Sequence, residues 1–473
     1  MRLERILAFS LAPIVVAAPA QAAEPGYHLD GAALGLGWVL PFAAVLLSIA
    51  VGPLAVPALW HRHYGKICAG WAACYLLPLA ALHGFEAALY QVAHTVLLEY
   101  LPFIVLLLAL FTVTGGLAVA LDRPATPAFN TGLLATGTLL ASWMGTTGAA
   151  MVLIRPLLRA NAWRRRRAHV VVFFIFLVAN IGGALTPLGD PPLFLGFLKG
   201  VPFFWPTRHL LLPTALTAGL VLAAFFVVDS FIYRKEPGPA PAARERSGEP
   251  HITGAVNILL LAGIVAVVLA SGIWHPGVSL ELFHAALPLE DLVRDLLLLA
   301  ITLLSWLLTP VATRRANGFG WGPIVEVAKV FAAIFVTIAP AIAILRAGSR
   351  GALAAVVDLV TAPDGTPLNA MYFWATGILS SFLDNAPTYL VFFSMAGGDP
   401  AVLTDPLATT LAAISTGAVF MGANTYIGNA PNFMVRAIAE ESGVRMPHFF
   451  GYMAWSGAVL IPIFLLVTWM FFR

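Results

Sequence analysis

The chain has 473 residues and a formal net charge of +3, and 60% of its residues are hydrophobic while only 10% are charged. Soluble domains carry roughly 25% charged residues, so this composition excludes an ordinary soluble protein and predicts an integral membrane protein. The small net charge gives no reason to expect a nucleic-acid partner.

Residues 1–22 contain two arginines, an apolar stretch and an Ala-Gln-Ala ending before Ala23. This pattern is typical of a cleavable signal peptide, so these residues are excluded from the predicted fold. The alternative is an uncleaved first helix, which Pro13 and Pro19 disfavour because proline interrupts a helix. Cleavage would leave the mature N-terminus outside the cytoplasm.

Beyond the signal, long apolar runs alternate with short polar loops. A helix that spans a bilayer needs about 20 apolar residues, and about ten runs are long enough. Two further apolar stretches, 128–158 and 368–396, contain Gly, Thr, Asn or Pro near their midpoints, which predicts re-entrant hairpins. The predicted fold class is an all-α polytopic membrane protein. The ten runs lie near 32–55, 67–83, 98–121, 168–200, 208–232, 254–273, 290–309, 319–346, 406–440 and 449–472.

Lysine and arginine collect in cytoplasmic loops of membrane proteins. We place the mature N-terminus outside the cytoplasm and let each re-entrant hairpin begin and end on the same side of the membrane. The cytoplasmic loops then hold most of the basic residues, so we expect a multi-pass protein of the inner (cytoplasmic) membrane. The run of four arginines at 164–167 is interpreted as a topological anchor rather than a lipid or nucleic-acid site. The basic residues assigned inside are Arg62, Lys66, Arg123, those of 155–167 and 234–246, Arg314, Arg315, Arg436 and Arg445; those outside are Lys199, Arg208, Arg346 and Arg350.

The segment 233–252 is rich in proline and charge and lacks an apolar period, which predicts a cytoplasmic linker. It divides the chain into a first repeat, 32–232, and a second repeat, 254–472.

These two halves resemble each other. The stretch ATGTLLASWMGTTGAAMVL from Ala135 aligns with ATGILSSFLDNAPTYLVFF from Ala375 at an offset of 240, and the Asn-Pro pair of NIGGALTP aligns with that of NTYIGNAP at an offset of 244. The charge pattern makes the halves enter the membrane from opposite sides. Inverted repeats with interrupted helices in corresponding places are typical of secondary transporters, whose site lies near the membrane midplane.

An unbroken helix over 168–200 would measure about 50 Å, well beyond a hydrocarbon core of about 30 Å. Two adjacent glycines and Pro187 predict a break in it. Unwound backbone at that depth is tolerated only where it lines a protein cavity. The freed carbonyls and the side chains of Asn180 and Thr186 offer oxygen ligands to a hard cation such as Na⁺, and Asp190 adds a negative charge.

Three motifs carry a family resemblance: NIGGALTPLGD from Asn180, FLDNAPT from Phe382 and GANTYIGNAPN from Gly422. They resemble the hairpin and broken-helix motifs of the ion transporter superfamily, which includes NhaD-type sodium/proton antiporters, citrate carriers, dicarboxylate symporters and arsenite pumps. The resemblance spans about 32–472 and is nearest to NhaD-type antiporters and a citrate-transport branch beside them. It implies a transporter rather than an enzyme.

The resemblance also implies that each half brings a hairpin tip and an unwound stretch to one ion or substrate site. Na⁺ and H⁺ are the expected cargo or coupling ions, and no cofactor is expected. Both tips differ from the Ser-Asn-Thr of the dicarboxylate members, which argues against a dicarboxylate site. The predicted binding residues, with the Na⁺ ligands among them, are Thr146, Thr147 and Gly148 at the first tip, Asp384, Asn385 and Thr388 at the second, and Asn180, Thr186, Asp190, Asn424, Thr425 and Asn429 in the unwound stretches.

Asp190 and Asp384 both fall at membrane depth, where ionisable groups are functional candidates by default. Burial favours the protonated form of a carboxyl group and a bound Na⁺ favours the ionised form, so one aspartate can exchange a proton for a cation. Replacing either with asparagine is predicted to abolish coupling. The alternative is that each aspartate only caps the start of a half-helix.

Glu326 and Lys329 lie three residues apart on one predicted helix face. They are interpreted as a structural salt bridge, with a part in a proton route as the alternative.

Other protein classes fit less well. An intramembrane aspartyl protease also uses two membrane aspartates, but Pro187 replaces a glycine of its Gly-x-Gly-Asp signature and Leu383 precedes Asp384 where that class has tyrosine. A passive channel would conduct without counter-ion coupling. Nothing resembles a phosphate-binding glycine loop with lysine, which disfavours an ATP-driven pump.

Among transporters, the two aspartates favour sodium/proton antiport. The alternative is sodium- or proton-coupled transport of citrate or another carboxylate, because helix N-termini can hold an anion without arginine. Either would work by alternating access, with the hairpins and broken helices moving against a scaffold formed by 32–121 and 254–346. The resemblance further implies a homodimer.

Overall fold

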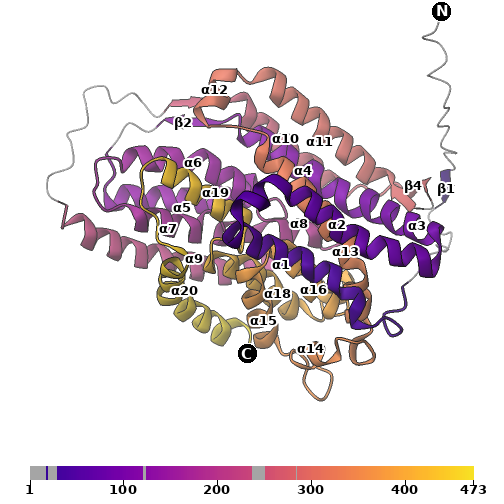
Figure 1. Cartoon of the computed structure of the whole chain (residues 1–473). Helices are drawn as coiled ribbons and strands as arrows, with labels where there is room; N and C mark the ends of the chain where they lie inside the picture. Colours follow the sequence, from indigo (N-terminus) through magenta and orange to yellow (C-terminus); the bar gives the residue numbers. More distant parts are fainter. Residues whose placement is uncertain (1–16, 20–28, 121–123, 237–250, 284) are drawn as a thin grey trace, which may run out of the picture.

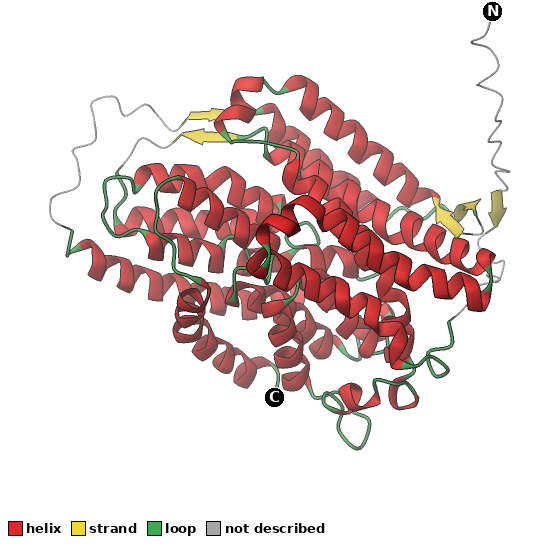
Figure 2. Ribbon diagram, viewed as in Figure 1, coloured by secondary structure: helices red, strands yellow, loops and turns green. Residues whose placement is uncertain are grey.

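The protein is described by a computed structural model that covers residues 17–19, 29–120, 124–236, 251–283 and 285–473. The predicted signal peptide lies outside these residues except for Ala17–Pro19, and most of the predicted linker 233–252 lies outside them too. Within the described residues the chain folds as a helical, polytopic membrane protein (Figures 1 and 2). Two small sheets accompany the helices in the described residues, one of order β1-β4-β5 and one pairing β2 with β3.

The strands are short and all pair antiparallel. In the three-stranded sheet Ala17 lies opposite Leu280 and Ser279 opposite Pro288, and in the two-stranded sheet Ala118 lies opposite Thr253. The strands are β1 (Ala17–Pro19), β2 (Ala118–Ala120), β3 (His251–Thr253), β4 (Val278–Leu282) and β5 (Ala285–Pro288).

One set of helices, which we call the scaffold group, comes from the start of each half. In Figure 1, α2, α3, α4, α10 and α11 lie together at the upper right, and α4 packs against α10 and α11 while α13 packs against α1 and α2. The group comprises η1 (Leu36–Val39), α1 (Leu40–Ala55), α2 (Pro57–His83), α3 (Phe85–Thr95), η2 (Val96–Tyr100), α4 (Leu101–Thr114), α10 (Val256–Ser271), α11 (Leu289–Leu308), α12 (Val311–Ala316) and α13 (Gly322–Arg346).

The remaining helices, which we call the core group, contain the interruptions. Each half supplies an antiparallel helix pair, an interrupted helix and a long final helix. In the first half these are α5 (Pro127–Met144), α6 (Thr146–Ala160), α7 (Ala168–Leu177), η3 (Ile181–Leu185), α8 (Pro191–Leu198) and α9 (Trp205–Tyr233). In the second half they are α15 (Asn369–Phe382), α16 (Asn385–Met395), α18 (Ala408–Met421), η5 (Gly422–Asn424), α19 (Ala430–Glu441) and α20 (Phe449–Phe471), with η4 (Gly348–Arg350), α14 (Ala354–Asp358) and α17 (Pro400–Thr404) in the connections.

In the core group, the hairpin of each half packs against the interrupted helix of the other half. Helix α6 of the first hairpin packs against α19, and α16 of the second hairpin packs against α8. Figure 1 shows α19, near the C-terminal end of the chain, lying beside α6. Each half-helix therefore rests on a hairpin from the other half.

Equivalent hydrogen bonds in the two halves are separated by one constant number of residues along the chain. The hydroxyl of Thr186 donates to the backbone oxygen of Ser142, and the hydroxyl of Thr425 donates to that of Ser381. Both pairs give an offset of 239. The offsets of 240 and 244 predicted from short identical motifs are therefore wrong. Asn180 precedes its break whereas Asn424 lies inside one, so the two are not equivalent.

Seven helical segments within the described residues are long and apolar enough to cross a membrane, and each matches one of the ten predicted runs. The other three runs differ for separate reasons. Helix α10 has only 16 residues, α11 begins with charged residues, and α18 ends at a break. Two of the predicted runs begin later than the helices they describe. Helix α2 begins at Pro57 instead of near residue 67, so Arg62 and Lys66 lie in a helix and not in a loop. The run predicted near 98–121 is helical over 85–114.

A fully buried ion pair holds one end of the core group together. Asp229 of α9 forms an ion pair with Arg164, with 2.6 Å between Oδ1 and Nη2, lies 2.7 Å from the ring nitrogen Nε2 of His169, and accepts from the Asn130 side chain at 3.1 Å. Arg164 was predicted to be part of a topological anchor. Instead its side chain is buried, while Arg165 and Arg166 are exposed. No local pattern pairs Arg164 with an aspartate 65 residues further along the chain.

We predict that Asp229→Ala lowers the free energy of unfolding by about 3–5 kcal/mol, because it leaves Arg164 buried without a counter-charge. The matched control is Glu440→Ala, which removes a partner of the half-exposed pair Arg436–Glu440 and should cost less than about 1 kcal/mol. Unfolding in mixed micelles by titration with sodium dodecyl sulfate measures both. Equal, small losses would contradict the structural role assigned to the buried pair.

Candidate functional site

The two interrupted helices restart at corresponding residues. Asp190 is the N-cap residue of α8 and Asn429 is the N-cap residue of α19, and both have extended backbone. An aspartate or asparagine in this position ordinarily caps the first turn with its side chain. Neither does so here, because both side chains turn toward the middle of the core group instead.

The carboxylate of Asp190 collects hydrogen bonds from both halves. It accepts from the Thr146 hydroxyl at 2.8 Å, from the Asn429 side-chain amide at 3.1 Å and from the side-chain amide of Asn385. Asp190 is 2% exposed. None of the ion pairs among the described residues includes it. A buried carboxylate held only by neutral donors is costly, and it is suited to take up a cation or a proton.

A chain of asparagine side chains continues from Asp190 and alternates between the halves. Asn429 also donates to the side-chain oxygen of Asn180 at 3.3 Å, and Asn180 donates to that of Asn432 at 2.7 Å. Asn432 in turn donates to backbone oxygens of the second break, those of Gly422 and Thr425. The two breaks are thus joined by side-chain amides, and Asn432 was absent from the predicted binding residues.

Hydroxyl groups attach each hairpin to the break of its own half. In the first half Ser142 donates to the backbone oxygen of Gly182 at 2.5 Å, and Thr186 donates back to Ser142. In the second half Thr425 donates to the backbone oxygen of Ser381 at 2.5 Å, and the amide of Asn424 donates to the Ser381 hydroxyl at 2.9 Å. Thr186, Thr425 and Asn424 were predicted as ligands, and here their donor groups bond to Ser142 and Ser381 at the ends of the first hairpin helices.

The two predicted acidic residues occupy different environments. Asp384 is half-buried and accepts from the backbone N–H of Ala386 at 3.0 Å, so its carboxylate caps α16. The Thr388 hydroxyl donates to the Asp384 backbone oxygen at 2.9 Å, one turn back along the helix. Asn385, next to Asp384, is the residue of this tip that reaches Asp190. The capping interpretation therefore describes Asp384 and does not describe Asp190.

A cavity of about 100 Å³ lies beside Asp190, between the two groups of helices. Core residues of the first hairpin tip line it, including Thr146, Thr147 and Gly148. The opposite wall is formed by apolar residues of the scaffold helices α4 and α13, namely Leu106, Leu107, Leu110, Phe111, Ile324 and Val327. Gly148 lets the tip approach the scaffold, because a Cβ there would lie 2.7 Å from the methyl group of Thr114. Among the described residues that line the cavity, Asp190 is the sole ionisable one.

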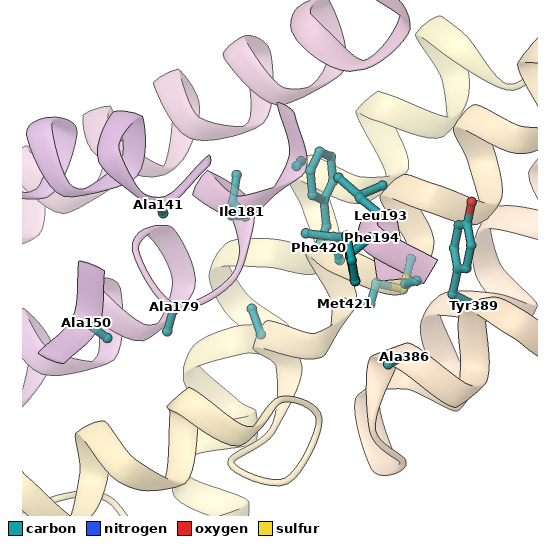
Figure 3. Close-up of a cluster of buried hydrophobic side chains, with 14 of the residues drawn as sticks. Ala141, Ala150, Ala179, Ile181, Leu193, Phe194, Ala386, Tyr389, Phe420 and Met421 are labelled. Atoms are coloured by element: carbon teal, nitrogen blue, oxygen red, sulfur yellow. The ribbon is translucent and has the colours of Figure 1, made fainter. Parts of the chain in front are cut away.

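Large apolar side chains keep the surroundings of the breaks dry. Figure 3 shows Leu193 and Phe194 of α8 near Phe420 and Met421 at the end of α18, with Tyr389 of α16 beyond them. All five are at most 3% exposed. In such low-dielectric surroundings the hydrogen bonds to Asp190 are electrostatically stronger than they would be in water.

Glu326 and Lys329 lie on one helix, α13, as predicted, but no ion pair between them is among those of the described residues. Lys329 is exposed, and its ammonium nitrogen lies 5.5 Å from the ring centre of Tyr64. Neither residue lines the cavity beside Asp190. The predicted salt bridge is therefore wrong.

Comparisons with known proteins give two similarities. A family model described as "Putative citrate transport" matches residues 31–472. Among solved structures, the YdaH transporter of Alcanivorax borkumensis, which is described as having an unusual topology, is similar with a TM-score of 0.42 and 15% identity, over 93% of this chain and 98% of that chain. None of the curated proteins compared matches the chain.

We predict that Na⁺ or Li⁺ raises the melting temperature of the detergent-solubilised protein and that Asp190→Asn abolishes this rise, because a ligand stabilises the state that binds it. Asp384→Asn is the matched control. Asparagine caps a helix about as well as aspartate, so this variant should keep both the cation response and its stability. The reverse pattern, with the response lost in Asp384→Asn and kept in Asp190→Asn, would contradict the assignment.

Proposed function

The chain belongs to the citrate-transport family and is a membrane transporter, and on this premise we propose that it moves citrate or another carboxylate together with a coupling cation. The observation that carries the proposal is the meeting of one carboxylate and three helix N-termini at one cavity. The helices α6, α8 and α19 begin at Thr146, Pro191 and Ala430, and all three residues line the cavity with Asp190.

Helix N-termini supply the attraction for an anion. Each carries a partial positive charge of about half an elementary charge. Helix α8 begins with Pro191 and Pro192, which have no N–H group, so this helix contributes its dipole rather than N–H donors at these positions. An anionic group at such a position is stabilised without any arginine or lysine. The convergence of three N-termini therefore supports a carboxylate-bearing solute in a cavity that has no basic residue in its lining.

Side-chain oxygens supply the ligands for a cation. The Asp190 carboxylate and the Thr146 hydroxyl lie 2.8 Å apart, and the side-chain oxygen of Asn385 is buried and accepts no hydrogen bond. Carboxylate, amide and hydroxyl oxygens are the ligands that hard cations such as Na⁺ prefer. Asn385 comes from the other half of the chain, so a cation bound here would hold the two halves together.

The same arrangement supports coupling between the two solutes. The carboxylate of Asp190 and that of the solute repel each other strongly in a water-poor site. A cation between them neutralises this repulsion, so the anion binds well only when the cation is present. We infer that this requirement couples the two movements. The cavity lies between the scaffold group and the core group, so movement of one group against the other would expose it to alternate sides.

Sodium/proton antiport is the second candidate function. It is favoured by Asp190, the sole ionisable residue of the cavity lining in the part of the chain that is described, because a single carboxylate can exchange a proton for Na⁺ without any further solute.

We predict that proteoliposomes accumulate labelled citrate when a Na⁺ or proton gradient is applied, and that Asp190→Asn reduces uptake to background because the coupling cation is lost. Asp384→Asn, which keeps the cap of α16, is the matched control and should retain uptake. A pH-sensitive dye in the same vesicles reports proton movement. If Na⁺ collapses a preset pH gradient while no citrate enters, antiport is the function and the carboxylate proposal is wrong.

A further inference from the structure

The scaffold and core groups meet along a seam between α4 and α8. These helices are in contact, and near the Asp190 end of the seam Leu106 and Leu110 of α4 line the cavity together with Pro191 and Phe194 of α8. Counted along the chain, these α4 residues lie after the start of that helix, while the α8 residues lie at its beginning. Glu99, two residues before α4, pairs with Lys199 at the end of α8, so the two helices run in opposite directions and the start of α4 lies beside the end of α8.

An ion pair lies at this other end of the seam. The ammonium nitrogen of Lys199 is 2.6 Å from the carboxylate oxygen Oε1 of Glu99. The two side chains are only 27% and 18% exposed. Among the ion pairs of the described residues, this is the one that joins the scaffold group to the core group; the others lie within one group.

The Glu99 side of the pair belongs to an irregular turn. Glu99 lies in η2, a single π-helical turn between α3 and α4. Such turns are rare and occur frequently at functional sites. The next residue, Tyr100, donates from its hydroxyl to the backbone oxygen of Ala328 at 3.0 Å, which attaches the turn to α13. Glu99 is thus fixed to the scaffold group.

The Lys199 side of the pair is fixed to the ion site. Lys199 is the C-cap residue of α8, and Asp190 is its N-cap residue. A helix of eight residues is rigid and about 12 Å long, so Lys199 and Asp190 move together. The cation at the C-terminus also interacts favourably with the helix dipole.

We propose that the Glu99–Lys199 pair is a latch that closes the end of the α4–α8 seam opposite the cavity. The proposal rests on the alternating-access function above. In the conformation described here the latch is engaged, and the cavity beside Asp190 lies at the first hairpin tip, toward the other end of the seam. Movement of α8 along α4 separates the two charges and opens the seam. Engagement of the latch therefore favours the present conformation over the alternative one.

Labelling of a cysteine beneath the latch tests this proposal without any transported solute. Leu195 is 2% exposed and lies one turn before Lys199 on the same face of α8. In a Cys68→Ala/Cys74→Ala background, the thiol of Leu195→Cys should react with N-ethylmaleimide in membranes roughly two- to fivefold faster when Glu99→Gln or Lys199→Gln is added, as expected for loss of a partly exposed pair. The exchanged pair Glu99→Lys/Lys199→Glu should return the rate toward that of the parent.

Two comparisons separate a latch from an ordinary structural pair. Arg436→Gln, which removes an ion pair inside the core group, should leave the labelling rate unchanged. Leu198→Cys, half-buried on the next turn, replaces Leu195→Cys if that variant fails to fold. Unchanged labelling in both neutralised variants, with a lowered melting temperature, would overturn the proposal. Because labelling needs no solute, this result leaves the proposed carboxylate transport to be judged by uptake alone.

Discussion

The hydrogen bonds to Asp190 are the interaction on which the rest of the core group depends. Thr146 from the first half and Asn385 and Asn429 from the second all donate to this one carboxylate. Two helix breaks and two hairpin tips thus converge on a charge with no basic partner in the described residues. Burying an ionised carboxylate away from water costs free energy, and a bound cation or proton lowers that cost.

Unwound backbone inside a membrane must find hydrogen-bond partners within the protein. Here short hydroxyl side chains supply several of them: those of Ser142 and Thr186 bond to backbone groups of the first break, and those of Ser381 and Thr425 bond to backbone groups of the second. These residues let each helix stop and restart, and the restart places an N-terminus at the cavity. The same constraint therefore creates both the gap in the helix and the partial positive charge that suits an anion.

The sequence was sufficient for the membrane class and for where most helices lie, because apolar runs and glycine or proline interruptions are strong local signals. The twelve predicted binding residues include Asp190 and the three residues that donate to it, Thr146, Asn385 and Asn429, since each lies in an interruption. The sequence could not separate Asp190 from Asp384, because both are aspartates that precede a half-helix and only the direction of the side chain distinguishes them. The Glu99–Lys199 and Arg164–Asp229 pairs join distant segments and have no local signature.

The central claim is that the Asp190 carboxylate itself takes up the coupling cation or proton. Infrared difference spectroscopy of the membrane-embedded protein, recorded before and after addition of Na⁺ at fixed pH, observes that group directly. The account predicts a change in a carboxyl or carboxylate band that is absent in Asp190→Asn and present in Asp384→Asn. A band change that survives in Asp190→Asn, or that disappears in Asp384→Asn, would contradict it.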